Sequence, residues 1–463
     1  MILARLLTQA EYGSFRQILM VTFLFYIFTY FCLSESASYY LASLNKTDKK
    51  KFVFQTLVFF LILGAISSLA LIFSRGFIAT SFSNPDLGKL LLIASVFPAL
   101  MMFSTFSSVS LITVGRAKLI SIIAFFATVL QILALVIPIV LGSNLESALV
   151  WYTIVRVVTT AIQVFLLIKI IGIIPVLDKT LIKEQLKFSI PYWISYATFI
   201  LYTQIHKILV SVFFTADQFA LFSVASTEIP ILTKLASQIA LVLIPVCVQF
   251  LEQKKVNKII DIWQKSATKV AMVILPVYIF LSLSAKDFLI VMFGNKYGKA
   301  WPIFLIILLL LPLKICDTQS LFKITGRTQY VIYVSIIALI IGLGSGWALI
   351  YPLGILGPVI GTILGRLAQI TTALIFINKD LPLSFFQAFA VKYNYKVLLA
   401  ALTAFVPVKL LTLAIHLPLV TLALNGMVGG VLFIIILYKF GLMHQEDLEL
   451  IKRWVTLRPI FEK

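Results

Sequence analysis

The chain has 463 residues, of which 61% are hydrophobic and only 12% are charged, whereas about a quarter of the residues of a soluble domain are charged. This composition excludes a soluble globular protein, because no water-soluble fold could bury so much apolar surface. The formal net charge of +20 does not indicate a nucleic-acid partner, since no soluble domain is predicted that could carry a basic face.

Apolar runs recur from end to end and predict an all-α protein that crosses the membrane about thirteen times. The first run is too long for a signal peptide and lacks a small-residue cleavage site. The expected spans are 17–42, 52–73, 88–113, 119–142, 146–172, 186–214, 218–250, 268–292, 299–324, 329–351, 354–377, 396–416 and 418–438.

Basic residues gather in every second loop. Four of the turns between these loops carry no Lys or Arg: Gly142–Glu146, Thr215–Gln218, Tyr351–Gly354 and His416–Pro418. Because basic loops stay in the cytoplasm, this pattern predicts an external N-terminus and a cytoplasmic C-terminus. The basic loops contain Lys46, Lys49, Lys50 and Lys51; Arg116 and Lys118; Lys179, Lys183 and Lys187; Lys254, Lys255 and Lys258; Arg327; Lys379 and Lys392; Lys452 and Arg453.

Three pairs of short segments recur about 210 residues apart and indicate two homologous halves, as in many transporters. The pairs are Glu11–Phe15 with Gln218–Phe222, Gly115–Arg116 with Gly326–Arg327, and the segments that follow Arg156 and Arg366. The repeat predicts an N-terminal lobe over 1–175, a C-terminal lobe over 176–380, and two additional helices with a cytoplasmic tail over 381–463.

The two copies of the repeat differ in what precedes them. The full span 186–214 precedes the second copy, whereas only Met1–Gln9 precedes the first. We therefore expect a further hydrophobic helix upstream of Met1, which would bring the complete protein to fourteen spans.

Polar side chains follow one face of two successive spans. Tyr192, Tyr196, Thr203 and Lys207 share a face of span 186–214, and Ser223, Thr227, Lys234 and Gln238 share a face of the next span. Two such stripes predict a hydrated groove. Aromatic rings suit stacking on sugars, and an ammonium in a poorly solvated cavity suits a pyrophosphate.

Charged residues inside spans cost about 2.5–3.5 kcal/mol each, so they are expected to face water, a partner or a ligand. Lys207 and Lys234 could line the groove, or could pair with Glu228 or snorkel to the interface. Arg156 and Arg366 could contact a ligand or tie helices together. Glu35 could be a counter-ion or a proton or sodium site.

Three further basic side chains are expected to have structural roles. Lys314 and Lys409 are expected to snorkel or pair helices, and His206 to be a neutral, hydrogen-bonding imidazole. Three cysteines, Cys32, Cys247 and Cys316, fall in apolar runs without metal spacing, so each is expected to be buried and structural.

Features of an enzyme are not found in the sequence. No loop clearly exceeds about twenty residues, and there is no phosphate-binding glycine loop, zinc spacing or nucleophile–base constellation. We therefore expect no enzymatic activity, no cofactor, no metal and no intrinsic ATPase.

Four short motifs carry a family resemblance: Ala4–Leu7 with Glu11–Gly13, Phe293–Tyr297, Thr325–Thr328 and Gly354–Pro358. With these motifs the chain resembles the polysaccharide-transport family of the multidrug/oligosaccharidyl-lipid/polysaccharide (MOP) flippase superfamily, which includes O-antigen and capsule-unit flippases. The family often has an Asp before the Lys of the helix that opens the second half. Here His206 precedes Lys207, so the role of that Asp is not carried over.

The resemblance implies two pseudo-symmetric six-helix lobes with two C-terminal helices. It also implies a flippase that moves undecaprenyl-pyrophosphate-linked repeat units of O-antigen (lipopolysaccharide), capsule or exopolysaccharide across the bacterial cytoplasmic (inner) membrane by alternating access. Expected partners are the lipid-linked oligosaccharide, membrane lipids, and polysaccharide polymerase and assembly proteins. The alternatives are a lipid II flippase, a multidrug or toxin exporter of the same superfamily, and a non-transporting scaffold for polysaccharide assembly.

Overall fold

The computed structural model describes residues 1–227, 229–415 and 417–441, and every regular element within them is a helix. By their contacts these residues divide into two compact units, each of which is described by itself. The predicted lobe boundaries at 175 and 380 concern homologous halves, which a division by contacts does not test, and they stay a prediction.

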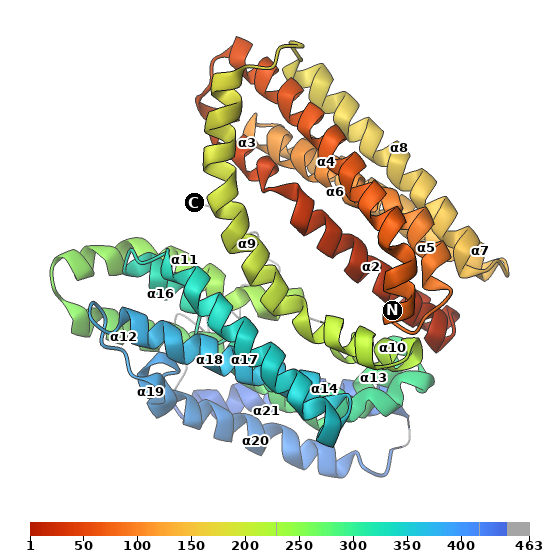
Figure 1. The fold of residues 1–463 in the computed structure, drawn as a ribbon. Coiled ribbons are helices and arrows are strands. Elements are labelled where there is room, and N and C mark those ends of the chain that lie inside the picture. Colours follow the sequence, from red (N-terminus) through yellow and green to blue (C-terminus); the bar gives the residue numbers. More distant parts are fainter. Residues whose placement is uncertain (228, 416, 442–463) are drawn as a thin grey trace. The chain divides into compact units, whose positions relative to one another are not determined.

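The first unit comprises residues 1–223 and 339–362. Helix α6 packs against α2, α3, α4 and α8, so it lies at the centre of this unit (Figure 1). Helices α7 and α8 form a closely packed pair joined by a short turn. The helices are α1 (Ile2–Leu6), α2 (Gln9–Tyr30), α3 (Leu33–Ser43), α4 (Lys46–Ser81), α5 (Leu87–Ile93), the 3-10 turn η1 (Ala94–Val96), α6 (Phe97–Thr113), α7 (Ala117–Val140), α8 (Leu145–Ile171) and α9 (Lys179–Phe213).

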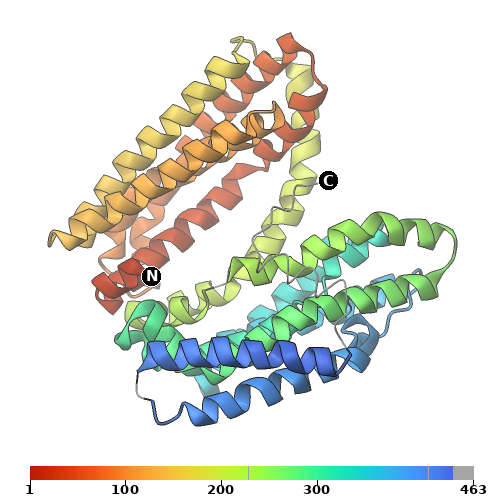
Figure 2. The same ribbon diagram turned by 180° about the vertical axis from the view of Figure 1, so that it is seen from behind.

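The second unit comprises residues 224–338 and 363–463. Helix α12 packs against α11, α20 and α21, and α20 and α21 lie side by side (Figure 2). Three helices contribute to both units: α10 (Ala216–Ala225), α17 (Tyr330–Leu353) and α18 (Leu356–Ile377). The others are α11 (Pro230–Glu252), α12 (Val256–Leu283), α13 (Ala285–Phe293), the 3-10 turn η2 (Asn295–Ala300), α14 (Trp301–Leu308), α15 (Leu310–Leu313), α16 (Thr318–Ile324), α19 (Phe385–Ala388), α20 (Val391–Leu411) and α21 (Pro418–Lys439).

Local sequence signals set where several helices begin. A capping box starts α2, because Thr8 Oγ1 accepts from the Glu11 amide and the Glu11 carboxylate accepts from the Thr8 amide. Asn45 caps α4 by accepting from the amides of Thr47 and Asp48. A proline stands in the first turn of α6, α11, α14 and α21, where its missing N–H costs no hydrogen bond.

Among the described residues, eleven helices are long and apolar enough to cross a membrane, and the bent pair α2–α3 makes a twelfth. This confirms a multi-pass, all-helical membrane protein. The remaining predicted span, 186–214, lies in the 35-residue helix α9, which is not among the eleven. We attribute this to the Tyr, Ser, Thr and Gln residues along α9, which make it less apolar than its neighbours.

Several spans that the apolar runs predict as continuous are broken. The predicted span 17–42 bends by 48° between α2 and α3, and the predicted span 218–250 is divided between α10 and α11. Pro230 opens α11 after Ile229, which is extended, so regular helix cannot run through this point. The predicted span 299–324 overlaps η2, α14, α15 and α16, which together form one candidate span, Asn295–Ile324.

Candidate functional site

The break between α2 and α3 is built from two residues in the left-handed region. Phe31 and Cys32 have φ angles of 47° and 51°, and neither is a glycine. A side chain in this region is strained, and such strain persists only where the surroundings hold it. Phe31 is held by Trp193 of α9, whose ring centre lies 4.7 Å away. Strained backbone of this kind gathers at functional and switching sites, which makes the break a candidate site.

The break leaves backbone carbonyls at the end of α2 without helical partners. The carbonyl of Ile27, in this last turn, accepts a 2.8 Å hydrogen bond from the indole Nε1 of Trp193. Because Trp193 also packs on Phe31, this one side chain of α9 contacts both the last turn of α2 and the first residue of the break. Helix α9 is therefore attached to the bend itself.

Glu35 lies in the first turn of α3, just beyond the break, and is half-buried. The phenol of Tyr30, the last residue of α2, donates a 2.6 Å hydrogen bond to Glu35 Oε2. Tyr30 is buried, and its ring packs against Tyr26 and Phe60 at 4.6 and 6.2 Å between ring centres. The hydrogen bond thus spans the bend and satisfies one oxygen of a carboxylate within a membrane helix, where an unpaired charge is costly.

An aromatic row lies on α9, which packs against the helix α3 that carries Glu35. Tyr192 and Tyr196 stack with their rings nearly parallel, 6.4 Å apart. Tyr192 is exposed, whereas Tyr196 is part-buried against the core of the first unit. One turn earlier, Phe188 stacks on Tyr39 of α3 at 5.7 Å. The first unit therefore brings together three predicted site residues, Glu35, Tyr192 and Tyr196.

A buried polar network fixes the position of α9 beside this row. The side-chain amide of Gln185 donates to Ser36 Oγ of α3 at 3.2 Å and to Thr56 Oγ1 of α4 at 3.0 Å. Gln55 of α4 donates to Gln185 Oε1 at 3.1 Å. All four residues are fully buried, so breaking one contact would leave polar atoms unpaired. Three helices are thus held in register around the break.

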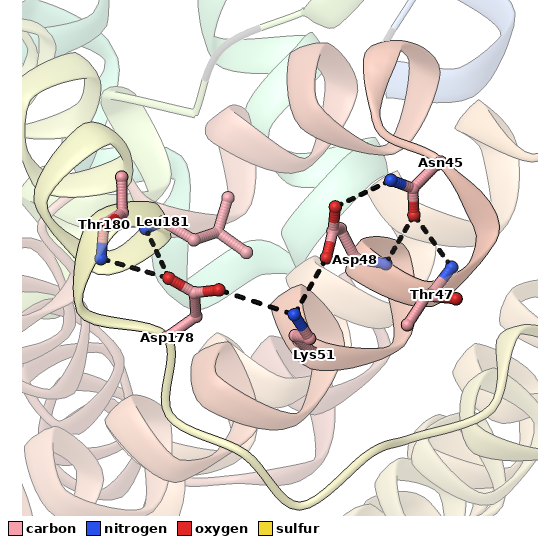
Figure 3. A network of polar contacts seen from close by, with 7 residues as sticks. All are labelled: Asn45, Thr47, Asp48, Lys51, Asp178, Thr180 and Leu181. Atoms are coloured by element: carbon pink, nitrogen blue, oxygen red, sulfur yellow. Dashed lines mark hydrogen bonds and ion pairs between the residues drawn. The ribbon is translucent and has the colours of Figure 1, made fainter.

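An ion-pair network joins two helices of the first unit near the basic loop Lys46–Lys51. Figure 3 shows Lys51 between the carboxylates of Asp48 and Asp178, at 3.1 and 3.5 Å. Asp178 also caps α9, accepting from the amides of Thr180 and Leu181. The Leu181 amide, aided by the Thr180 amide and by Lys51, lowers the pKa of Asp178 below its ordinary value against the opposing effect of burial. The network ties the start of α4 to the start of α9.

Arg156 and Arg366 make contacts within the protein. Arg156 donates to the Tyr152 hydroxyl at 3.0 Å, and its guanidinium lies 4.9 Å from the centre of the Phe97 ring. Arg366 donates to the Gln369 side chain and to the carbonyls of Leu313 and Cys316, at 3.3 Å and 3.0 Å for the carbonyls. These contacts favour the structural interpretation of both arginines.

The structure describes only some of the residues predicted to line the basic groove. Lys207 is part-buried on α9, about 16 Å along the helix axis from Tyr196 at 1.5 Å per residue. Its neighbour His206 packs on Phe222, with 5.6 Å between ring centres. Gln238 is exposed on α11. The side chain of Lys234 and the whole of Glu228 lie outside the described residues.

The prediction that Ser223, Thr227, Lys234 and Gln238 share one helix face is wrong. Ser223 belongs to α10, Thr227 follows its end, and the other two belong to α11. The break before Pro230 interrupts the helical period on which that face depends. By contrast, Tyr192, Tyr196, Thr203 and Lys207 all lie on the continuous helix α9.

Lys409 pairs helices, as the sequence suggests, through a 2.7 Å ion pair with Asp287 between α20 and α13. Sequence reasoning missed Tyr30 and Trp193. A tyrosine five residues before a membrane carboxylate was a weak signal for the former. No local signal marks the latter, because its partner Ile27 lies in another helix.

Solved structures of transporters have the same fold. An inward-facing multidrug resistance MATE family transporter of the MOP superfamily is 14% identical over 82% of this chain and 92% of its own, with a TM-score of 0.67. The lipid II flippase MurJ, in an inward closed conformation, is 16% identical over 93% of this chain and 97% of its own, with a TM-score of 0.67. A MOP superfamily transporter from Pyrococcus furiosus, whose description reports reversed polarity of its binding pocket, is 16% identical over 82% of this chain and 90% of its own, with a TM-score of 0.56.

These likenesses confirm the MOP transporter fold that the resemblance implied. No curated protein matches the sequence. Residues 2–302 match the sequence profile of the family described as "Polysaccharide biosynthesis protein". The matched segment is more than half of the chain and includes the α2–α3 break, Glu35 and the aromatic row of α9. The chain therefore belongs to the polysaccharide biosynthesis protein family and has the fold of MOP superfamily transporters.

Proposed function

We propose that this protein is a flippase that moves undecaprenyl-pyrophosphate-linked oligosaccharide repeat units of O-antigen, capsule or exopolysaccharide across the bacterial cytoplasmic membrane. The observation that carries the proposal is the aromatic row of α9, where exposed Tyr192 stacks on Tyr196 and the helix packs against α3, which carries Glu35. Aromatic rings combine an apolar face for a sugar ring with a hydroxyl that hydrogen-bonds a polar ligand. The family to which the chain belongs supports the same class of substrate.

In this proposal the residues of the site have different tasks. Tyr192 and Tyr196 contact the saccharide, and Lys207 with Lys234 attracts the pyrophosphate, since ammonium–phosphate contacts are strong where water is scarce. Glu35 is the ion-coupling or counter-ion group, held by Tyr30. The polyprenyl tail stays in the lipid bilayer and does not enter a protein cavity.

Transport proceeds by alternating access, with the saccharide site open first to one side of the membrane and then to the other. A strained bend beside the site suits such a change, because two arrangements of a bent helix can differ by only a few kcal/mol. The energy comes from an ion gradient, the membrane potential, or synthesis and consumption of the substrate on opposite sides. Polysaccharide polymerase and assembly proteins would act on the delivered unit.

A leaflet-accessibility assay tests this function. The purified chain is reconstituted into liposomes with a defined undecaprenyl-pyrophosphate glycan, and a saccharide-modifying enzyme added outside reports how much substrate reaches the outer leaflet. Lipid II and a cationic drug, tested in matched liposomes, separate the two rival transport functions. A scaffold for polysaccharide assembly would move none of the three.

A further inference from the structure

An open pocket of about 520 Å³ lies at the end of α4 remote from Lys46 and Lys51. Its volume falls within the range of small-ligand sites. Along α4, Arg75 is roughly 36 Å from Lys51 at 1.5 Å per residue, which exceeds the thickness of the hydrocarbon core. The lining includes Arg75, Gly76 and Thr80 of α4, Ser83 and Asn84 of the following turn, and Lys89 of α5.

Two cationic side chains line the pocket, Arg75 and Lys89. In the described part of the chain, neither Arg75 nor Lys89 makes an ion pair or a side-chain hydrogen bond. Arg75 is part-buried and Lys89 is exposed. Asp86 is exposed and does not line the pocket. Two cations and a serine hydroxyl without an opposing acid favour an anion, and a guanidinium fork with an ammonium suits phosphate oxygens.

The position of these charges calls for a reason other than membrane orientation. Basic residues collect on the cytoplasmic side, where the loop charges place Lys46–Lys51. Arg75 and Lys89 lie at the opposite end of the same unit, the end predicted to face outward. Topology therefore does not account for them, whereas a ligand at that surface does.

The pocket is held in shape by buried contacts. The amide of Asn84 donates to Ser14 Oγ and Gln17 Oε1 of α2, both at 2.8 Å, and Asn84 is buried. This anchors the turn that follows α4. At Gly76 a Cβ would meet no atom within 4 Å, so an added side chain would occupy open space at the pocket.

The neighbouring surface is suited to lipid. Phe73 and Phe77, which flank Arg75 on α4, are 84% and 75% exposed. Exposed aromatic rings beside basic groups are typical of the membrane interface, where acyl chains lie against the rings and headgroups lie at the polar level. A ligand with a phosphate and a lipid tail can contact both surfaces at once.

We propose that the Arg75–Lys89 pocket binds the phosphate group of a lipid at the membrane surface remote from the basic loops. Two lipids carry that chemistry. One is the diphosphate of the transported saccharide on its arrival in the far leaflet, an assignment that rests on the proposed function. The other is the phosphate of a bulk anionic phospholipid.

A fluorophore in the pocket distinguishes these sources. Pro85→Cys, at an exposed lining residue that offers no hydrogen-bond donor, is labelled with bimane in the full chain after Cys32, Cys247 and Cys316 are replaced by Ala, and the protein is placed in phosphatidylcholine nanodiscs. Undecaprenyl pyrophosphate and dioleoyl phosphatidylglycerol are then titrated in separately. Each is expected to change the emission. Half-saturation by the diphosphate at a tenfold lower mole fraction assigns the site to substrate, and equal half-saturation assigns it to bulk lipid.

Variants test whether the two cations and the open space are responsible. Arg75→Gln with Lys89→Gln should raise the half-saturating mole fraction about tenfold or more, because both charge-assisted contacts to the phosphate are lost. Gly76→Leu keeps both charges but fills the space, and should weaken binding similarly. Arg116→Gln with Lys118→Gln, a matched pair at the exposed basic loop, should change nothing.

Three results overturn the pocket proposal: no response to either lipid, unchanged titration in both the charge and the Gly76 variants, or equal weakening by the control pair. The readout does not depend on transport. A chain that binds these lipids in the pocket but fails to flip saccharide would retain this site and reject the proposed function.

Discussion

Tyr30 Oη and Glu35 Oε2 are 2.6 Å apart across the bend between α2 and α3. The two side chains belong to different helices, so their hydrogen bond holds the bend at one angle. Tyr30 is fully buried, and its ring position is set by Tyr26 and Phe60. The contact therefore links a membrane carboxylate, the strained backbone and the aromatic row of α9 in one structure.

Tyr30→Phe removes this hydrogen bond but keeps the packed ring. Leaving a half-buried carboxylate with one fewer donor should lower the free energy of unfolding by about 1–3 kcal/mol and reduce transport at normal protein abundance. Tyr40→Phe is the matched control, because Tyr40 is also buried in the same core but makes no side-chain hydrogen bond among the described residues. Thermal unfolding in detergent and flipping in liposomes measure the two effects. Equal behaviour of both variants would contradict a role for the contact.

Because Cys32 has a left-handed backbone conformation, Gly should destabilise the protein less than Val at this position, the reverse of the order expected inside a helix. At Cys32, Gly should be better tolerated than Val by about 1–2 kcal/mol, because a β-branched residue is strained at positive φ. At Cys247, which is equally buried but lies inside α11, Val should be better than Gly by about 1 kcal/mol. Thermal unfolding of the four single variants tests this. The same ranking at both positions would argue against a strained bend.

The aromatic row should contribute to transport through its rings. Tyr192→Ala should reduce flipping about tenfold, since one sugar–aromatic stacking contact is worth on the order of 1 kcal/mol or more, and Tyr192→Phe should retain most activity. Because Tyr192 is exposed, neither change should alter stability much. Tyr438→Ala, at an exposed tyrosine of α21, is the control. Full flipping by Tyr192→Ala would remove Tyr192 from the saccharide site.

Arg366 should need its guanidinium rather than only its charge. Lys cannot reach Gln369 and the carbonyls of Leu313 and Cys316 together, so Arg366→Lys should lower the free energy of unfolding by roughly 1.5–3 kcal/mol. Arg116→Lys, at an exposed loop arginine, should be neutral in the same unfolding measurement. Normal stability of Arg366→Lys combined with lost transport would instead indicate ligand contact.

The sequence predicts the helical membrane fold well because a membrane span needs a long apolar run, and such runs are visible locally. The bend at Phe31–Cys32 could not be predicted, since neither Gly nor Pro marks it. Its cause is tertiary: Trp193, from a distant helix, packs on Phe31 and binds the Ile27 carbonyl. By contrast, Pro230 marks in the sequence the break between α10 and α11, which separates Ser223 and Thr227 from Lys234 and Gln238.

Half of the candidate site follows from the sequence. Glu35, Tyr192 and Tyr196 stand out as a membrane carboxylate and an aromatic pair at helical spacing, but their proximity depends on the packing of α9 against α3. The Arg156 and Arg366 contacts show why charge inside a span is weak evidence for ligand binding. A backbone carbonyl or an aromatic face can satisfy an arginine as well as a substrate can.

The central claim is that the chain flips a lipid-linked saccharide, and the leaflet-accessibility assay tests it most directly. Liposomes with the wild-type chain should expose the undecaprenyl-pyrophosphate glycan to the external enzyme faster than protein-free liposomes. Lys207→Ala and Lys234→Ala should each slow exposure, whereas Arg at either position should be milder, because the cation that attracts pyrophosphate is kept. Exposure no faster than in protein-free liposomes, from folded and inserted protein, would contradict the account.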